Sequence, residues 1–148
     1  MADLGDFATL AAADHGLVVV STLRGDGTIQ ASVVNAGVLD HPLSGVPVVA
    51  AVFRGGAHKL ANLRLRPQIT VVARAGWQWV AVEGRAELAG PDDPLPGIDG
   101  ERLRILRREI FTTAGGSHDN WDEYDRVMAA ERRTAALITP SRIYSPAG

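Results

Sequence analysis

The 148-residue chain is 46% hydrophobic, which predicts one globular domain spanning residues 1–148, with too little length for two. The net charge of −2 gives no basic face for nucleic acid, so we predict no nucleic-acid partner. The chain has no cysteine, which excludes a thiolate metal site, and its four histidines lack the spacing of metal ligands, so we predict no bound metal. No basic amino-terminal stretch precedes an apolar core, and the apolar runs are only strand-length, so we expect a cytoplasmic protein with no membrane partner.

A strand-rich region makes up the first two-thirds of the chain. The composition of FATLAAADHG predicts an opening helix that stops at Gly16. Runs rich in β-branched residues then predict five strands, at 17–23, 28–37, 46–54, 68–74 and 77–88. The hairpin residues RGDG join the first two strands, and a turn at Ala75 and Gly76 joins the last two. Five strands so close together predict a barrel or a sandwich.

The last third of the chain is predicted to be mainly helical. A loop rich in proline and glycine, GPDDPLPGIDG, separates it from the strands. Helical spacing of apolar residues predicts helices at 101–111 and 119–133, which would plug or flank the barrel. The run TAALITPSRIY, residues 134–144, has strand composition and would close the sheet.

Two faces alternate along the second predicted strand. One is apolar, and the other carries Gln30, Ser32 and Val34. We expect this mixed face to line a site.

A short helix is predicted between the third and fourth strands, in GGAHKLANLRLRP, residues 55–67. Lys59, the only lysine of the chain, shares one polar face with Asn62 and Arg66, while Leu60 and Leu63 share an apolar face. A glycine-preceded helix start with a nearby ammonium suits an anion such as phosphate. The alternative is a solvated surface helix with a charged face.

Several stretches, taken in order, resemble the split-barrel flavin and deazaflavin oxidoreductases related to pyridoxamine 5′-phosphate oxidase. They are VVVSTLRGDGTIQASVVNAG, VVAAVFRGGAHKLANLRLRPQITVVA, WQWVAVEGRAEL and ITPSRIYS, and together they span roughly residues 17–144. The most specific element, KLANLRLRPQITV, is similar to the Lys-x-x-Asn-Leu-Arg-x-x-Pro pattern of the mycobacterial-type branch that uses the deazaflavin coenzyme F420. The resemblance implies a mainly β fold, a six-stranded antiparallel split β-barrel with flanking helices, working as a homodimer with cofactor sites at the interface.

The resemblance also implies the residues that hold the cofactor. Its phosphate or side chain would be held by Lys59 and Asn62, with positive charge from Arg54 and Arg66. The strand along the flavin-type ring would contribute Gln30, Ser32, Val34 and Asn35. Backbone contacts would come from Ala51 and Val52. At least one of Trp77 and Trp79 would reach the site across the dimer, the alternative being that both tryptophans only pack.

The implied activity is that of a coenzyme F420-dependent oxidoreductase. It would transfer a hydride between the deazaflavin and a small electron-poor substrate such as an enone, a quinone or a tetrapyrrole. The alternatives are an FMN-dependent reductase or oxidase of the same fold, and a non-catalytic F420- or flavin-binding protein. The second strand opens GTIQASVV without arginine and the chain ends RIYSPAG, so pyridoxamine phosphate oxidase activity is not expected.

No residue is assigned as catalytic. The proton that must follow the hydride would come from Tyr144 or from solvent, and the histidines are interpreted as loop or cap residues. Of these, His58 is the first to test because it precedes Lys59.

Overall fold

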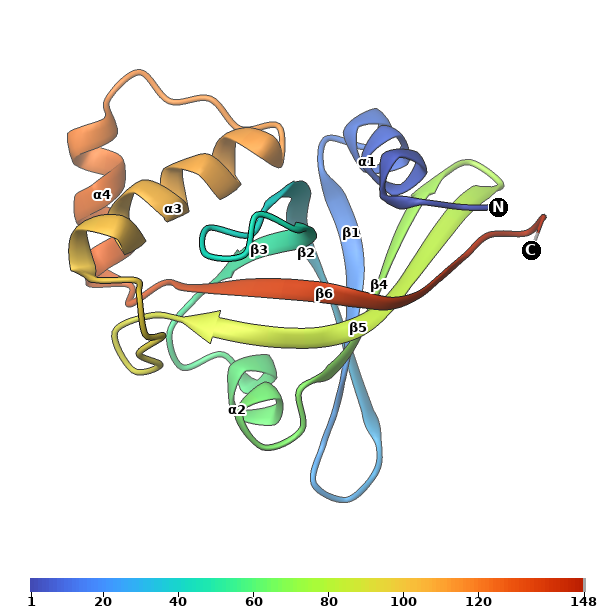
Figure 1. The fold of residues 1–148 in the computed structure, drawn as a ribbon, viewed down its shortest axis with the longest axis horizontal. Helices are drawn as coiled ribbons and strands as arrows, with labels where there is room; N and C mark the ends of the chain where they lie inside the picture. Colours follow the sequence, from blue (N-terminus) through green and yellow to red (C-terminus); the bar gives the residue numbers. More distant parts are fainter. Residues whose placement is uncertain (148) are drawn as a thin grey trace.

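A computed structural model describes residues 1–147 of the chain, which form six strands and four helices (Figure 1). The helices are α1 (Leu4–Ala13), α2 (His58–Leu65), α3 (Gly100–Thr113) and α4 (Trp121–Ala130). The strands are β1 (Leu17–Leu23), β2 (Ile29–Asp40), β3 (Pro47–Phe53), β4 (Gln68–Ala75), β5 (Gln78–Ala89) and β6 (Thr134–Tyr144).

The strands close into an antiparallel barrel in the order β1-β2-β3-β6-β5-β4. The prediction of a six-stranded antiparallel barrel with flanking helices is thus confirmed. The last strand, β6, lies between β3 and β5 and closes the sheet as its composition predicted. Within residues 1–147 the helices are too short or too polar to span a lipid bilayer.

The core of the barrel is aliphatic, and α1 covers one of its ends. Alternate residues of the strands point inward, among them Val20 and Val71, which are almost completely buried. Phe7 of α1 inserts into the same core. Helix α1 begins earlier than predicted, at Leu4, because Asp3 and Asp6 form a reciprocal capping box at its start.

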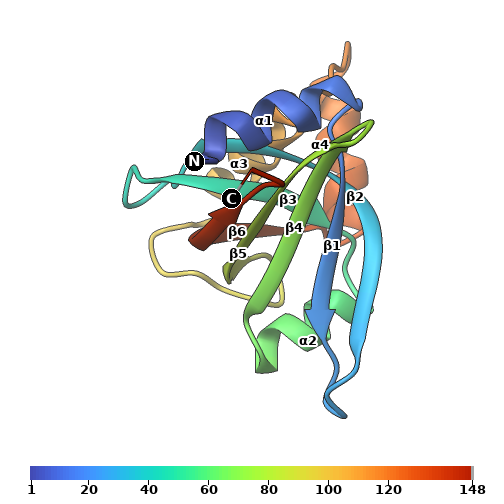
Figure 2. The same ribbon diagram turned by 90° about the vertical axis from the view of Figure 1, so that its right-hand side faces the viewer.

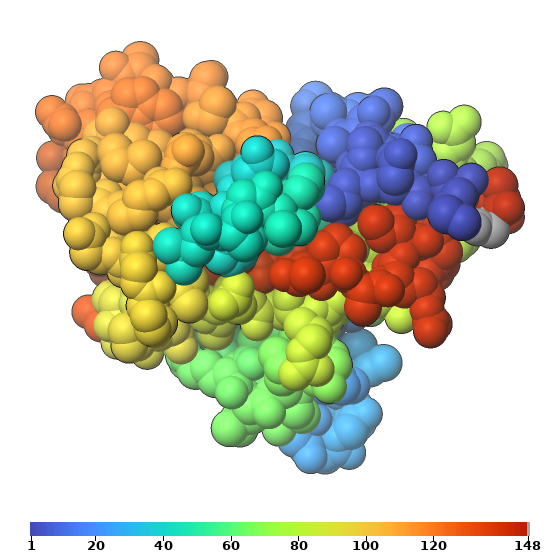
Figure 3. Space-filling view, viewed as in Figure 1, coloured from blue at the N-terminus to red at the C-terminus, as the bar shows by residue number. Residues whose placement is uncertain are grey.

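Glycine lets the carboxyl end of α3 approach the barrel closely. A Cβ on Gly16, whose φ is +75°, would lie 2.0 Å from the carbonyl oxygen of Ala114. A Cβ on Gly37 would lie 2.5 Å from the carbonyl oxygen of Thr113. Because both positions lack a side chain, α3 and α4 sit together on one side of the barrel, separated from α1 by the β2–β3 loop (Figures 1 and 3).

The barrel has a fork where β2 leaves β3. In the described chain, the β2–β3 ladder ends at the pair Ala36 and Ala51. Beyond it, β2 continues along β1 down to Ile29, while β3 continues along β6 to Phe53. The two strands therefore diverge and leave facing edges that are not paired with each other.

Helix α2 lies at the opposite end of the barrel from α1 (Figure 2). Its residues Leu60 and Leu63 enter the core, as their predicted apolar face requires. Asn62 is also buried, and its Nδ2 donates to Thr22 Oγ1 at 3.1 Å and to Gln30 Oε1 at 3.0 Å. The predicted polar face of this helix therefore turns toward the strands, because inward-facing polar groups of β1 and β2 satisfy it there.

Candidate functional site

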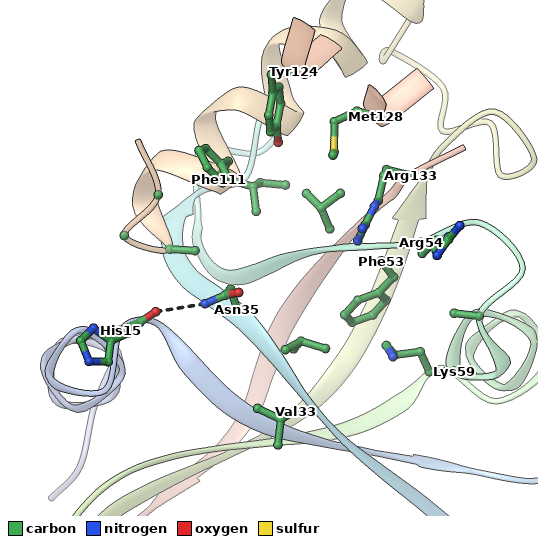
Figure 4. A pocket seen from close by; sticks show the side chains of 17 residues that line it. His15, Val33, Asn35, Phe53, Arg54, Lys59, Phe111, Tyr124, Met128 and Arg133 are labelled. Atoms are coloured by element: carbon green, nitrogen blue, oxygen red, sulfur yellow. Dashed lines mark hydrogen bonds between the residues drawn. The ribbon is translucent and has the colours of Figure 1, made fainter. Parts of the chain in front are cut away.

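The fork opens into a cavity of about 500 Å³. Residues 33–35 of β2 line one side and residues 52–54 of β3 and its end line the other. The start of α2 and the facing surfaces of α3 and α4 complete its walls (Figure 4). Its volume is within the range of small-molecule sites.

Lys59 points from α2 into this cavity. Its Nζ donates to Ser32 Oγ at 3.3 Å and lies 5.2 Å from the centre of the Phe53 ring. Burial, together with the nearby Arg133 guanidinium, lowers the pKa of Lys59 below its usual value. The ammonium is therefore held in place by a neutral hydroxyl and a ring face, without a neutralising carboxylate.

Three cations gather at this end of the cavity, namely Arg54, Lys59 and Arg133 (Figure 4). Arg133 also donates through Nε to Glu131 at 2.9 Å, so part of its charge is balanced outside the cavity. Among the described residues that line the cavity there is no aspartate or glutamate. The cationic end formed by these three residues is thus suited to an anionic ligand.

The edges of the fork also offer backbone hydrogen-bonding groups. Ala36 donates its N–H to Gly16 on the β1 side. Successive residues of a strand present their backbone groups to opposite edges, so those of Val33 and Asn35 face the fork. By the same alternation across the β2–β3 ladder, the backbone groups of Val52 face it from the other side. A flat heterocycle with donors and acceptors on its edge matches such a slot.

The turn between α1 and β1 closes the far end of the cavity. Asn35 Nδ2 donates to the backbone oxygen of His15 at 3.0 Å (Figure 4). His15 has a φ of 59°, which is unusual for a residue other than glycine, and it lines the cavity. His58, the first histidine chosen for testing from sequence, is not among the lining residues described, although its neighbours Ala57 and Lys59 are.

The residues predicted to bind a cofactor divide into three groups by position. Those that line the cavity are Val34, Asn35, Val52, Arg54 and Lys59. A second group lies behind the lining: Ser32 holds Lys59, Gln30 holds Asn62, and Ala51 forms the last rung of the ladder. The third group lies elsewhere and consists of Arg66, Trp77 and Trp79.

Arg66 does not lie in the helix that was predicted to include it. Helix α2 ends at Leu65, and Arg66 adopts an extended conformation with φ of −139°. Its Nε donates to the backbone oxygen of Leu23 at 3.0 Å, next to the β1–β2 hairpin. Its guanidinium therefore braces that hairpin and is not part of the cationic end.

The two tryptophans lie at the other end of the barrel. Trp77 falls in the β4–β5 turn, not in the strand as predicted, and is 97% exposed. Trp79 packs edge-on against Tyr144, with ring centres 6.1 Å apart. Both tryptophans line a separate hollow beside α1 and the carboxyl end of the described chain. Tyr144, a candidate proton donor, donates its hydroxyl to Glu83 at 2.8 Å and does not line the cavity.

Several lining residues were not singled out from the sequence. Arg133 adds the third cation, and Phe111, Tyr124 and Met128 form an apolar wall. The amphipathic spacing of the helices predicted that they would flank the barrel, but no local pattern marks which residues meet the fork. Within residues 1–147, no cluster of histidine and carboxylate side chains could hold a metal ion.

Comparisons with known proteins concern the fold. No protein-family model matches the chain. A pyridoxamine 5′-phosphate oxidase-related, FMN-binding protein from Nostoc punctiforme has a similar structure, with a TM-score of 0.66 at 10% identity, covering 98% of this chain and 84% of that one. A conserved hypothetical protein from Mycobacterium tuberculosis gives the same TM-score and coverage at 17% identity.

An F420 reductase is also similar, with a TM-score of 0.58 at 13% identity, covering 86% of this chain and 88% of that one. These structures share the closed antiparallel barrel with flanking helices described above. The chain therefore has the pyridoxamine 5′-phosphate oxidase-like, FMN-binding split-barrel fold.

Proposed function

We propose that this chain is a cytoplasmic, coenzyme F420-dependent oxidoreductase that acts on an electron-poor organic substrate such as an enone, a quinone or a tetrapyrrole. The observation that carries the proposal is the cavity at the fork, where Arg54, Lys59 and Arg133 gather with no carboxylate among the described lining residues. Hydride transfer is the chemistry that a bound reduced deazaflavin supplies.

The lining residues fit a flat heterocycle that carries a phosphate. The cationic end accepts the phosphate, and Ser32 holds Lys59 toward it. The backbone edges of Val33, Asn35 and Val52 are placed to bind the polar rim of the ring. The walls contributed by α3 and α4 exclude water from its face.

Two observations favour F420 over FMN. The sequence KLANLRLRPQITV resembles the F420-using branch, and its Lys59 and Asn62 are both held against β2 by hydrogen bonds. In addition, β2 carries no arginine near its start, and its polar residues Gln30 and Ser32 already bind α2.

We propose in addition that the protein is a homodimer with shared cofactor sites. The outer face of β1 and β2, two strands that Figure 2 shows side by side below α1, carries exposed aliphatic side chains, among them Val19, Ile29 and Val33. Val33 and Val19 are paired in adjacent strands, and they are 63% and 41% exposed. Val33 also lines the cavity, so a second copy seated on this face would border the site.

Titration of the purified protein with F420 and, separately, with FMN tests the proposed function. We expect F420 to bind in the micromolar range or tighter and FMN to bind more weakly, as followed by the fluorescence of each cofactor. Tighter binding of FMN than of F420 would mean that the cofactor is the flavin and not the deazaflavin. If neither cofactor binds, the cavity at the fork is not a cofactor site.

A further inference from the structure

The wall of the cavity that α3 and α4 provide differs in chemistry from the cationic end. Ile110 and Phe111 come from α3, and Tyr124 and Met128 come from α4. In Figure 4 Phe111, Tyr124 and Met128 lie above the cavity, away from Lys59. We call these four residues the α3–α4 wall.

Tyr124 lines the cavity, and its hydroxyl group already donates a hydrogen bond within the protein. The hydroxyl donates to the backbone oxygen of Arg107 at 3.0 Å. Burial raises the pKa of Tyr124 to about 12, so the phenol stays neutral near pH 7. The other wall residues are aliphatic, aromatic or a thioether. The α3–α4 wall therefore offers an apolar surface without a free strong donor or acceptor.

This wall is held rigidly from behind. The ring of Phe111 lies 4.9 Å from that of Tyr124, and 6.1 Å from and perpendicular to that of Trp121. Asp125 of α4 accepts hydrogen bonds from Arg104 Nη1 at 2.9 Å and from Arg108 Nε at 3.0 Å, both on α3. A wall braced in this way selects ligands by shape, because its side chains have little freedom to rearrange.

Charge is distributed unevenly between the two parts of the cavity. Arg54, Lys59 and Arg133 all lie at the cationic end, and no described lining residue from α3 or α4 is charged. Once the phosphate of a cofactor occupies the cationic end, a second ligand with carboxylates finds no free cation along the wall. A carboxylate placed there without a partner would lose its hydration without compensation.

We infer that the α3–α4 wall is a specificity-determining subsite for an uncharged, flat, apolar substrate, with Phe111 and Met128 as its selecting side chains. This inference rests on the proposed function, since it assigns the cationic end to the cofactor. It favours a quinone or an enone on a hydrophobic body over a tetrapyrrole that carries carboxylates.

Calorimetric titrations with two probes test the subsite, each performed with and without saturating F420. The uncharged probe is 2-methyl-1,4-naphthoquinone and the dianionic one is biliverdin. With F420 bound, so that the cationic end is occupied, we expect the parent protein to bind the naphthoquinone more tightly than biliverdin. Met128→Lys should weaken naphthoquinone binding by about tenfold or more, because the ammonium must be desolvated against the ligand. Met128→Leu, which conserves volume and polarity, should change it by less than about threefold.

A matched control is available next to Met128. Val127 lies on the same helix, is 39% exposed and does not line the cavity, so Val127→Lys should leave binding of both probes unchanged. Circular dichroism of each variant verifies that α4 is intact. Equal naphthoquinone binding by Met128→Lys and the parent, or tighter binding of biliverdin than of the naphthoquinone by the parent with F420 bound, would overturn the subsite while F420 binding stands. Failure to bind F420, with the naphthoquinone pattern intact, would instead overturn the proposed function.

Discussion

At the scale of single residues, we propose that Lys59 binds the cofactor phosphate and contributes little to the stability of the fold. Its ammonium is partly desolvated beside Arg133, and its pKa is lowered for those two reasons. Without a bound anion, burying the ammonium costs free energy, and this cost offsets the stabilisation from the hydrogen bond to Ser32 and the contact with the Phe53 ring. A bound phosphate removes that cost by supplying the missing negative charge.

We expect Lys59→Ala to weaken F420 binding by about tenfold or more, since a charge-assisted hydrogen bond contributes about 1.5–3 kcal/mol. The free energy of unfolding should change by less than about 0.5 kcal/mol, as for other partly exposed positions. Fluorescence titration and denaturant unfolding measure the two quantities. Arg126, an exposed cation of α4 outside the cavity, gives the control Arg126→Ala, which should bind F420 like the parent. Equal binding by Lys59→Ala and the parent would remove Lys59 from the site.

At the scale of elements, α3 and α4 behave as one unit because Asp125 joins them. The hydrogen bonds from Arg108 and Arg104 hold the pKa of Asp125 below its usual value. A carboxyl group whose pKa is lower in the folded protein contributes stability above its unfolded pKa. That contribution disappears as the pH falls through the lowered folded pKa.

Asp125→Asn should therefore lower the free energy of unfolding at pH 7 by up to about 1 kcal/mol, the range of partly exposed ion pairs. Between pH 7 and pH 2 this difference should shrink, because the parent carboxyl becomes protonated as the pH falls through its lowered folded pKa. Denaturant unfolding at both pH values measures this, and hydrogen exchange should show faster exchange in α4 of the variant at pH 7. If the difference in unfolding free energy is the same at both pH values, the ion pairs of Asp125 with Arg104 and Arg108 do not stabilise the contact between α3 and α4.

At the scale of the whole molecule, we propose that a second copy of the chain packs on the outer face of β1 and β2. Val19 and Ile29 lie on this face, 41% and 64% exposed, and neither lines the cavity. We expect the parent to be a dimer by light scattering. The double variant Val19→Lys with Ile29→Lys should be monomeric yet folded, because exposed strand positions accept lysine in a monomer but an apolar interface does not. It should also bind F420 more weakly, since the second copy would no longer border the site.

Val127→Lys again provides the control, because it adds a lysine to α4 without touching this face. It should remain dimeric. A parent protein that is monomeric at high concentration would contradict the shared site, and a dimeric double variant would move the interface to another surface.

Local sequence patterns predicted every strand of the barrel, and for β1 and β6 both limits agree with the structure. The carboxyl end of β2 extends beyond the predicted residue 37, because residues 38–40 pair with β3. Other boundaries that differ are governed by caps and turns, as at α1, where Asp3 and Asp6 extend the helix toward the amino terminus. Trp77 is another, because the hairpin turn takes Gly76 and Trp77 and β5 begins one residue later. Strand periodicity alone does not distinguish the last residue of a turn from the first of a strand.

Only part of the candidate site could be predicted from the sequence. The resemblance to the split-barrel oxidoreductases named five of the residues that line the cavity, which are Val34, Asn35, Val52, Arg54 and Lys59. Arg133 and the α3–α4 wall are distant in sequence from these residues, and they reach them only because α3 packs on Gly16 and Gly37. Arg66 does not share the helical face of Lys59, because α2 ends before it and its side chain instead contacts Leu23.

The sequence by itself determined the strands and the helices, since these depend on neighbours within a few residues. Only the tertiary structure decided where β2 and β3 diverge, which cations meet there and which face of β2 stays exposed. Those features depend on strand register and on backbone contacts between elements far apart in the chain. No local pattern of residues encodes such contacts, because each is the joint result of two surfaces that form separately.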